Sequence, residues 1–182
     1  MHYETVIIGA GAAGMMCAAH AGGSCLLIDH AKAPGEKIRI SGGGRCNFTN
    51  LYASPENFIS GNPHFAKSAL ARYTQWDFID LVARHGIAYH EKTLGQLFCD
   101  HSAKDIIAML LAEMKNADAA LELNTSVSRI AKSPQGFDLD LGDGRKISAA
   151  NVVIATGGKS IPKMGASGFA YDIARQFGLP VT

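Results

Sequence analysis

The chain has 182 residues, 47% of them hydrophobic, which is enough apolar surface for one compact domain. Its 17 lysines and arginines almost balance 16 aspartates and glutamates, so no global field favours nucleic acid or an anionic membrane. The apolar runs are far shorter than the roughly 20 residues that span a bilayer, and residues 1–14 do not resemble a signal peptide, so we expect a soluble protein.

The first residues predict a strand, a helix and a second strand. Residues 4–9 contain four consecutive β-branched side chains, which indicate a strand buried on both faces, as in a parallel sheet. Residues 12–21 are mostly small and predict a helix, and residues 25–28 predict a second buried strand that ends at Asp29. This βαβ-type order predicts an α/β fold with a Rossmann-like parallel sheet.

A glycine-rich loop joins the first strand to the helix. Gly9, Gly11 and Gly14 fit the G-x-G-x-x-G pattern, and the acidic Asp29 follows at about the expected 20 residues. Gly9 permits the tight turn, Gly11 lets a pyrophosphate approach the backbone, and Gly14 lets helix and strand pack closely. A purely structural turn is the weaker alternative, and the loop alone does not distinguish FAD from NAD. The residues expected to bind the dinucleotide here are Gly9, Gly11, Ala12, Ala13, Gly14 and Asp29.

Residues 35–50 form a second glycine-rich stretch. Three cations, Lys37, Arg39 and Arg45, flank three successive glycines in it. Such a stretch can wrap backbone amides around a polar ligand. A flexible surface loop is the alternative, but the polar side chains that accompany the glycines favour a shaped site.

The middle of the chain is expected to be mostly helical. Asn62 and Pro63 predict the start of one helix, and Thr74 with Asp77 three residues later predicts a capping box for another. Ser102 and Asp105 repeat that box before an apolar stripe with helical spacing, which indicates core packing. The stripe consists of Ile106, Ile107, Leu110, Leu111 and Met114.

From Leu121 the pattern changes to strands. Residues 127–130, the alternating residues 137–141 and residues 145–148 predict a small antiparallel β-meander within 121–148. The meander is therefore expected as an addition to the parallel sheet.

The last predicted elements are a strand and a helix. Residues 152–155 predict a separate, fully buried strand, and Gly157 and Gly158 after it allow a ligand to approach the backbone. Ser167 is expected to cap a final helix that runs to Gly178.

Three segments together make the chain resemble the BaiN/RdsA-type flavoproteins. They are residues 9–14, residues 37–50 and residues 155–163, and the Ser-Gly-Gly-Gly-Arg-Cys-Asn-x-Thr-Asn block from Ser41 is the most specific of them. The resemblance extends over essentially the whole chain. It implies a fold of the two-dinucleotide-binding-domain type, FAD as the cofactor and oxidoreductase activity, with NADH or NADPH as a candidate electron donor.

The resemblance also implies roles for particular residues. The first glycine loop and Asp29 would hold the ADP moiety, and residues 41–47 would lie along the flavin. Val127 would reach the adenine, and residues 155–158 would pass close to the dinucleotide; no catalytic residue is assigned. The further cofactor-binding residues expected in this way are Lys37, Ser41, Gly42, Gly43, Arg45, Asn47, Val127, Ala155, Thr156, Gly157 and Gly158.

Proteins of this kind are much longer, with an inserted domain and a C-terminal segment that completes the flavin site. We therefore expect residues 1–182 to be the N-terminal FAD-binding domain of a longer flavoprotein, incomplete for turnover by itself. The expected substrate is a small molecule, either an amine to be oxidised or an activated carbon–carbon double bond to be reduced. Because FAD proteins more often have glutamate at the position of Asp29, an NAD(P)-dependent dehydrogenase stays as one alternative; a non-catalytic dinucleotide-binding module is the other.

The cysteines complete the prediction. Cys17, Cys25, Cys46 and Cys99 lack the close spacing of zinc ligands or redox pairs, so we expect free thiols, no disulfide and no metal. Cys46 is interpreted as a packed or flavin-adjacent thiol. The expected location is the cytoplasm, with no nucleic-acid partner, no membrane partner and an undetermined oligomeric state.

Overall fold

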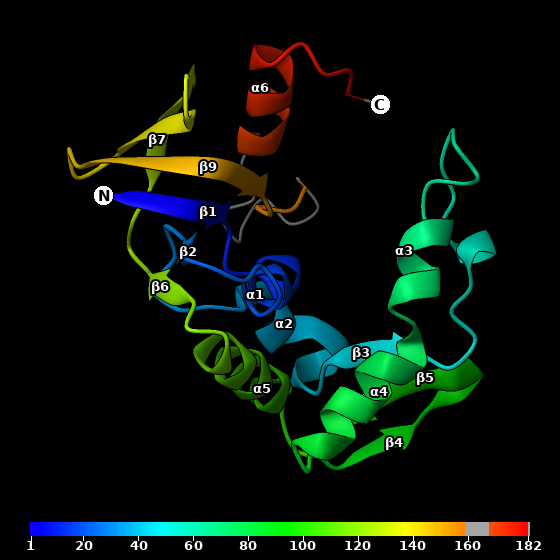
Figure 1. Ribbon diagram of the computed structural model, residues 1–182. Helices are drawn as coiled ribbons and strands as arrows, with labels where there is room; N and C mark the ends of the chain where they lie inside the picture. Colours follow the sequence, from blue (N-terminus) through cyan, green and yellow to red (C-terminus); the bar gives the residue numbers. More distant parts are fainter. Residues whose placement is uncertain (159–167, 182) are drawn as a thin grey trace. The chain divides into compact units, whose positions relative to one another are not determined.

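The structure is a computed structural model that describes residues 1–158 and 168–181 (Figure 1). The chain divides into two compact units: a first unit of residues 1–37 and 110–182, and a second unit of residues 38–109. Within the described ranges, no helix is long and apolar enough to cross a membrane.

The first unit is built on a six-stranded sheet. Its strands, in spatial order, are β6 (Ala120–Glu122), β2 (Cys25–Ile28), β1 (His2–Ile8), β9 (Lys146–Ile154), β8 (Gly136–Leu141) and β7 (Val127–Ser133). Neighbours from β6 to β9 pair in parallel, whereas β9, β8 and β7 pair antiparallel. The predicted α/β fold, with a parallel sheet and an antiparallel meander, is confirmed.

Strand β9 belongs to both parts of this sheet. Lys146 to Ala149 pair antiparallel with β8, and Ser148 to Ile154 pair in parallel with β1. The prediction of two separate strands, at residues 145–148 and 152–155, was wrong. Residues 149–151 stay extended and join the two segments into one strand. Val152 and Ile154 are also only partly buried, since each packs against the core on one side.

Alternating residues of the parallel and antiparallel strands build the main core. Val6 and Ile8 of β1 share one buried cluster with Leu139 and Leu141 of β8. Ile7, which points to the opposite face, is fully buried as well. The prediction that the first strand is buried on both faces is confirmed.

Three helices accompany this sheet. They are α1 (Ala12–Ala18), α5 (Ala103–Asn116), which begins in the second unit, and α6 (Phe169–Gln176). Ile106, Leu110 and Met114 of α5 are each 2% exposed, which confirms the predicted core stripe. The predicted cap of the last helix, Ser167, lies outside the described residues, and Gly168 occupies the N-cap position of α6.

The second unit contains an antiparallel sheet that the sequence analysis missed. Its strands, in spatial order, are β3 (Asn47–Asn50), β5 (Gln96–Cys99) and β4 (Tyr89–Glu91). Strands of three or four residues are too short for a period of two to be recognised. The helices are α2 (Glu36–Ile40), α3 (Lys67–Arg72) and α4 (Gln75–Arg84), with short 3-10 turns at Ser41–Gly44, Pro55–Asn57 and Thr93–Gly95.

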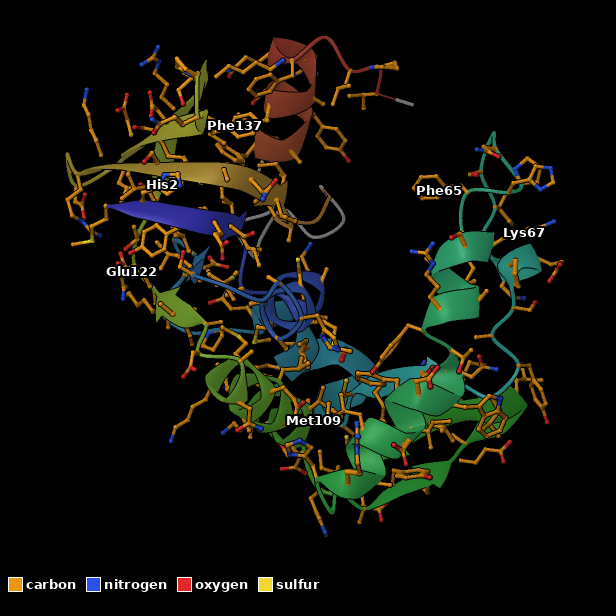
Figure 2. All side chains as sticks on the ribbon, in the orientation of Figure 1. His2, Phe65, Lys67, Met109, Glu122 and Phe137 are labelled. Atoms are coloured by element: carbon orange, nitrogen blue, oxygen red, sulfur yellow. The ribbon has the colours of Figure 1, made fainter. Side chains whose placement is uncertain are left out.

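Three helix starts were predicted in this unit. The helices expected after Thr74 and Ser102 begin there, as α4 and α5, whereas the helix expected at Asn62 does not. Thr74 caps α4, and both its backbone N and its Oγ1 donate to Asp77 Oδ2, at 2.7 and 2.6 Å. No helix begins at Asn62: residues 63–66 form turns, and α3 starts only at Lys67. Helix α3 buries no side chain, and Phe65 just before it is 80% exposed (Figure 2).

Candidate functional site

Three loops meet where the parallel strands β2, β1 and β9 end. Ile8 pairs with Ile28 on one side and with Ile154 on the other, so the residues that follow these three strands are neighbours. In open parallel sheets, ligands bind beyond the carboxyl ends of the strands. The glycine loop, Asp29 and residues 155–158 are therefore brought together at the position where a nucleotide is expected.

The three glycines of the first loop serve different purposes. A Cβ on Gly14 would lie 1.9 Å from Gly9 O, and one on Gly9, whose φ is +112°, would lie 2.5 Å from Ala155 O. These two glycines are required by packing within the chain. Gly11 has an ordinary φ of −85°, and a Cβ there would meet no atom within 4 Å. The space beside Gly11 is thus open to a ligand.

Asp29 anchors the glycine loop as well as facing the site. Its Oδ2 accepts from Ala10 N at 2.6 Å, and its Oδ1 accepts from Ala31 N at 2.8 Å. The side chain is 15% exposed, and His30 Nδ1 lies 3.4 Å from Oδ1. A carboxylate has about four lone-pair positions, so capacity remains for ribose hydroxyls. The bond from Ala31 N is local, whereas the sequence did not indicate the bond from Ala10 N, because it depends on the tertiary approach of two loops.

Changing Asp29 to asparagine tests both roles. Asp29→Asn keeps the shape but loses the charge and one acceptor, so we expect the free energy of unfolding to fall by about 1–3 kcal/mol. FAD binding should weaken by a similar ~1–3 kcal/mol, because a charge-assisted bond to the ribose is lost. Urea denaturation and fluorescence titration with FAD measure the two effects. Asp80→Asn, at a 68% exposed side chain, is the control; an unchanged FAD affinity in Asp29→Asn would exclude the ribose contact.

The loop after β9 contains a buried hydroxyl that the described part of the chain does not pair. Thr156 Oγ1 is buried and has no hydrogen-bond partner among the described residues. Lys37 Nζ donates to Gly158 O at 3.2 Å. Tyr171 of α6, which the sequence analysis missed, places its hydroxyl 3.2 Å from the position of a Cβ on Gly158. Because buried polar atoms are normally paired, Thr156 is a candidate for a ligand contact.

Backbone hydrogen bonding also connects the start of the second glycine-rich stretch to the first loop. Gly35 N donates to Ala10 O at 2.8 Å, and Gly35 has a φ of +70°. Lys37 follows two residues later in α2, and its ammonium reaches the loop after β9 through its hydrogen bond to Gly158 O. Lys37 is among the residues that the sequence analysis expects to bind the cofactor.

The Ser41 to Asn47 block lies in the second unit and folds into a 3-10 turn followed by β3. Gly42, Gly43 and Gly44 all have positive φ, from +56° to +87°. A Cβ on Gly42 would lie 2.7 Å from the ring of Phe98, whereas one on Gly43 would meet nothing within 4 Å. The turn therefore packs on β5 through Gly42 and leaves Gly43 accessible.

The remaining predicted site residues divide between the two units. Arg45 and Asn47 belong to the second unit with the glycine turn, and Val127 starts β7 in the first unit, partly buried against the core. Arg39, which was not among the predicted binding residues, has a buried Nε without a partner in residues 1–158 and 168–181. No group of three metal-ligating side chains occurs in those same ranges.

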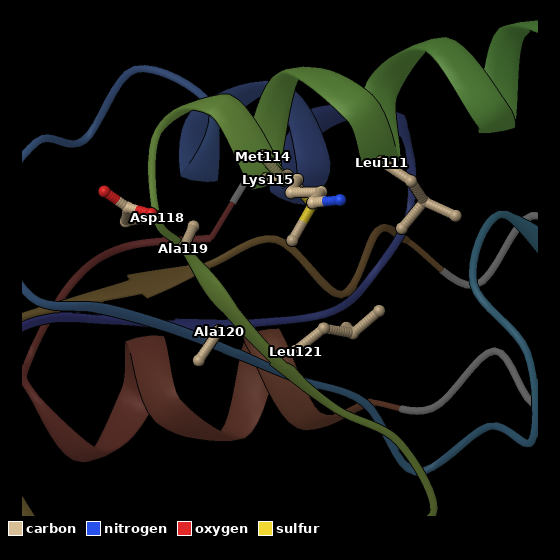
Figure 3. Close-up of a pocket in the computed structure, with 7 residues that line it drawn as sticks. All are labelled: Leu111, Met114, Lys115, Asp118, Ala119, Ala120 and Leu121. Atoms are coloured by element: carbon tan, nitrogen blue, oxygen red, sulfur yellow. The ribbon is translucent and has the colours of Figure 1, made fainter.

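An open pocket elsewhere in the first unit does not belong to this site. It lies between the end of α5 and β6, and Met114, Lys115 and Leu121 help to line it (Figure 3). Leu121 pairs with Leu27, one position before the end of β2. The pocket is therefore on the outer edge of the sheet, away from the loops at its centre.

The cysteines of the second unit are buried thiols. Burial raises the pKa of Cys46, and it raises the pKa of Cys99 to about 12, with the neighbouring Cys46 adding to the effect. Cys46 is 6% exposed and Cys99 is fully buried. This agrees with the interpretation of Cys46 as a packed thiol, because the reactive form of a cysteine is the thiolate.

The raised pKa of Cys99 predicts a loss of stability in alkali. The folded state holds the thiol proton more tightly than the unfolded state, whose pKa is near 9.0. The stabilisation is therefore complete below about pH 9 and is lost as the pH rises towards 12. We expect the difference in free energy of unfolding between wild type and Cys99→Ala to shrink across this range. Urea denaturation at several pH values measures it, and a constant difference would contradict the prediction.

Comparison with known proteins agrees with this geometry. Residues 3–182 match the HI0933-like protein Rossmann domain. The "Ribosomal RNA dihydrouridine synthase" of Escherichia coli (strain K12) is 58% identical over 98% of this chain and 45% of its own length. The "3-dehydro-bile acid delta(4,6)-reductase" of Clostridium scindens is 27% identical over 94% of this chain and 43% of its own length. The chain thus spans less than half the length of these curated relatives.

Solved structures show the same fold. The open conformation of a flavocytochrome c3 fumarate reductase aligns with a TM-score of 0.62 and 20% identity, over 97% of this chain and 40% of that chain. At this identity the likeness concerns the fold alone. The family match covers nearly every residue and confirms the resemblance found from the three motifs. The chain therefore belongs to the HI0933-like family, and it comprises the Rossmann domain of that family.

Proposed function

We propose that this chain is the FAD-binding portion of a flavoprotein oxidoreductase that reduces a uridine of ribosomal RNA to dihydrouridine. The 58% identity to a ribosomal RNA dihydrouridine synthase over nearly the whole chain carries the proposal. Residues 1–182 would form the N-terminal domain of a protein of similar length to that relative.

The residues of the first unit fit the ADP half of FAD. The open space beside Gly11 accommodates a pyrophosphate, and Asp29 has lone pairs left for the ribose. The buried Thr156 hydroxyl, which has no partner within residues 1–158 and 168–181, would gain one, and Lys37 adds a cation nearby. When bound, FAD supplies hydride transfer through its isoalloxazine ring.

The second unit is proposed to contact the flavin. Its glycine turn exposes backbone at Gly43, and Arg45 and Asn47 follow directly. Backbone amides in such a turn can bind the polar edge of a ligand without side chains in the way. Val127 is kept as the proposed contact to the adenine.

The proposed substrate changes the expectation about partners. With a net charge near zero, the protein as a whole does not attract nucleic acid electrostatically, but a local nucleic-acid site is still compatible with this charge. The name of the Escherichia coli relative favours RNA over the small molecule expected from the sequence. Reduction of a carbon–carbon double bond, one of the two reactions anticipated, is the reaction that forms dihydrouridine. The dehydrogenase and the non-catalytic module are not favoured by these relatives.

Reduction of a small molecule is the second candidate, because a reductase named for a bile acid is also a relative, at 27% identity. An NADH- or NADPH-dependent reduction of FAD would serve either substrate. The much higher identity to the RNA-modifying relative decides our order of preference.

The test uses the protein extended to the length of its relatives. We expect a flavin absorption spectrum that NADH or NADPH bleaches. Ribosomal RNA from a strain that lacks the gene for this protein, and is therefore unmodified at the target uridine, should restore the spectrum. Mass spectrometry of the digested RNA should then show one uridine two mass units heavier. A bleached flavin that RNA does not reoxidise, with no dihydrouridine formed, would refute the proposed substrate; an absence of flavin would refute the cofactor.

The 182-residue chain alone is expected to bind FAD more weakly than the extended protein and to show no turnover. A flavin without an enclosing site lacks the fixed dipoles and positioning that accelerate the reaction. Steady-state assays of both proteins at equal flavin loading measure the difference. Equal turnover of the two would contradict this prediction.

A further inference from the structure

A histidine and an aspartate form a close pair on neighbouring strands of the second unit. His90 lies in β4 and Asp100 directly follows β5, and His90 Nδ1 is 2.7 Å from Asp100 Oδ1. The side chains are 43% and 38% exposed, so the pair is accessible from solvent. The backbone N of Asp100 donates to Ala88 O at 2.9 Å, which fixes the aspartate at the end of the strand.

This contact determines which imidazole nitrogen faces outwards. A carboxylate accepts hydrogen bonds, so Nδ1 carries the hydrogen in the neutral ring, and Nε2 is left as the atom that exchanges protons. The carboxylate also fixes the orientation of the ring, as in other carboxylate–histidine pairs that transfer protons. The pair therefore has the composition of a proton donor and the group that orients it.

Phe98 connects the pair to the glycine turn within the same unit. The His90 ring stacks on the Phe98 ring, with centroids 6.3 Å apart and planes inclined by 19°. On the same ring, a Cβ on Gly42 would lie 2.7 Å from Cε1. The next residue, Cys99, donates from its backbone N to Arg45 O at 2.9 Å. His90 is thus one aromatic ring away from the turn that we assign to the flavin.

The proposed reaction needs a proton as well as a hydride. The uracil ring accepts a hydride at C6 from reduced flavin, its C5–C6 double bond becomes a single bond, and negative charge develops at C5 and the C4 oxygen. A proton must then form the C5–H bond. The hydride would come from bound FAD in its reduced form, which NADH or NADPH, the donor class named above, would restore.

We propose that His90, oriented by Asp100, is the catalytic acid that protonates the substrate carbon in this reduction. The inference rests on the proposed function. The imidazolium gives its Nε2 proton to C5, becomes neutral, and is protonated again from solvent. Cys46, a thiol close to the turn, is buried and has a raised pKa, whereas His90 reaches solvent.

The experiment separates the two half-reactions of the extended protein. In His90→Gln we expect unchanged flavin content and unchanged flavin reduction by NADPH, because neither needs the acid. Reoxidation of the reduced flavin by unmodified ribosomal RNA should slow about 100-fold or more, the usual effect of removing a general acid. Asp100→Asn should also slow the reoxidation of the flavin by ribosomal RNA, but by a smaller factor than His90→Gln. His101→Gln, at the exposed histidine next to Asp100, is the matched control and should behave as wild type.

A measurement without turnover tests the geometry. Nitrogen-15 NMR of the extended protein should show the neutral His90 ring protonated at Nδ1, and Asp100→Asn should change this tautomer ratio. A normal rate of reoxidation in His90→Gln, with dihydrouridine still formed, would overturn the inference while the proposed function stands. Equal losses in flavin content and in both half-reactions would also overturn it, because they indicate a structural role. Absence of dihydrouridine with wild type would instead refute the proposed function.

Discussion

Gly14→Ala is expected to prevent the first unit from folding stably. The added Cβ would lie 1.9 Å from Gly9 O and 3.3 Å from Leu27 Cδ1, so helix α1 must move away from the start of the glycine loop. The obstacle is backbone, which cannot rotate aside as a side chain can. Overpacking of this kind costs about 3 kcal/mol or more, a large part of the stability of a domain. Thermal and urea denaturation followed by circular dichroism measure the loss.

The matched control is Gly11→Ala in the same loop. A Cβ at Gly11 meets no atom within 4 Å and the backbone there has an ordinary φ, so the free energy of unfolding should change by about 1 kcal/mol or less. If Gly14→Ala were as stable as wild type, helix α1 and strand β1 would not approach each other as closely as the structure shows.

Gly11→Val is expected to abolish FAD binding while the fold survives. The valine side chain would occupy the open space that we assign to the pyrophosphate, and it would block the approach to the backbone. We expect the affinity for FAD to fall at least about 100-fold, which corresponds to roughly 2.7 kcal/mol. Fluorescence titration with FAD gives the affinity, and circular dichroism with urea denaturation shows whether helix content and stability are retained.

Two outcomes would contradict this assignment. Copurification of Gly11→Val with a full complement of flavin would mean that the pyrophosphate lies elsewhere. A loss of stability as large as that of Gly14→Ala would mean that Gly11 is required by packing. Comparing Gly11→Val with Gly14→Ala therefore distinguishes a glycine that is needed for FAD binding from one that is needed for folding.

The sequence predicted the features that depend on neighbouring residues. The glycine loop, the strands on either side of α1 and the apolar stripe of α5 follow from local spacing. The capping box at Thr74 is also local, since its partner Asp77 is three residues away. A pattern of this kind is complete within a few residues, so no knowledge of distant segments is needed.

The sequence did not predict features that depend on pairing between distant segments. β9 is one strand because two different neighbours, β8 and β1, continue its ladder. In the small sheet, β3 pairs with the distant β5, for example Asn47 with Phe98. The same holds for Asp29, which bonds to Ala10 N across a gap that only the folded chain closes.

By itself, the sequence determined that this protein has a Rossmann-type glycine loop with an acidic residue at the end of the next strand. Only the tertiary structure decided what each part of that motif does. Gly9 and Gly14 are needed because other backbone atoms lie where their Cβ atoms would be, whereas Gly11 faces open space. The reason is physical. A sequence pattern shows that a glycine is needed at a position, but the neighbouring atom that leaves no room for a Cβ is known only when distant segments have been brought into contact.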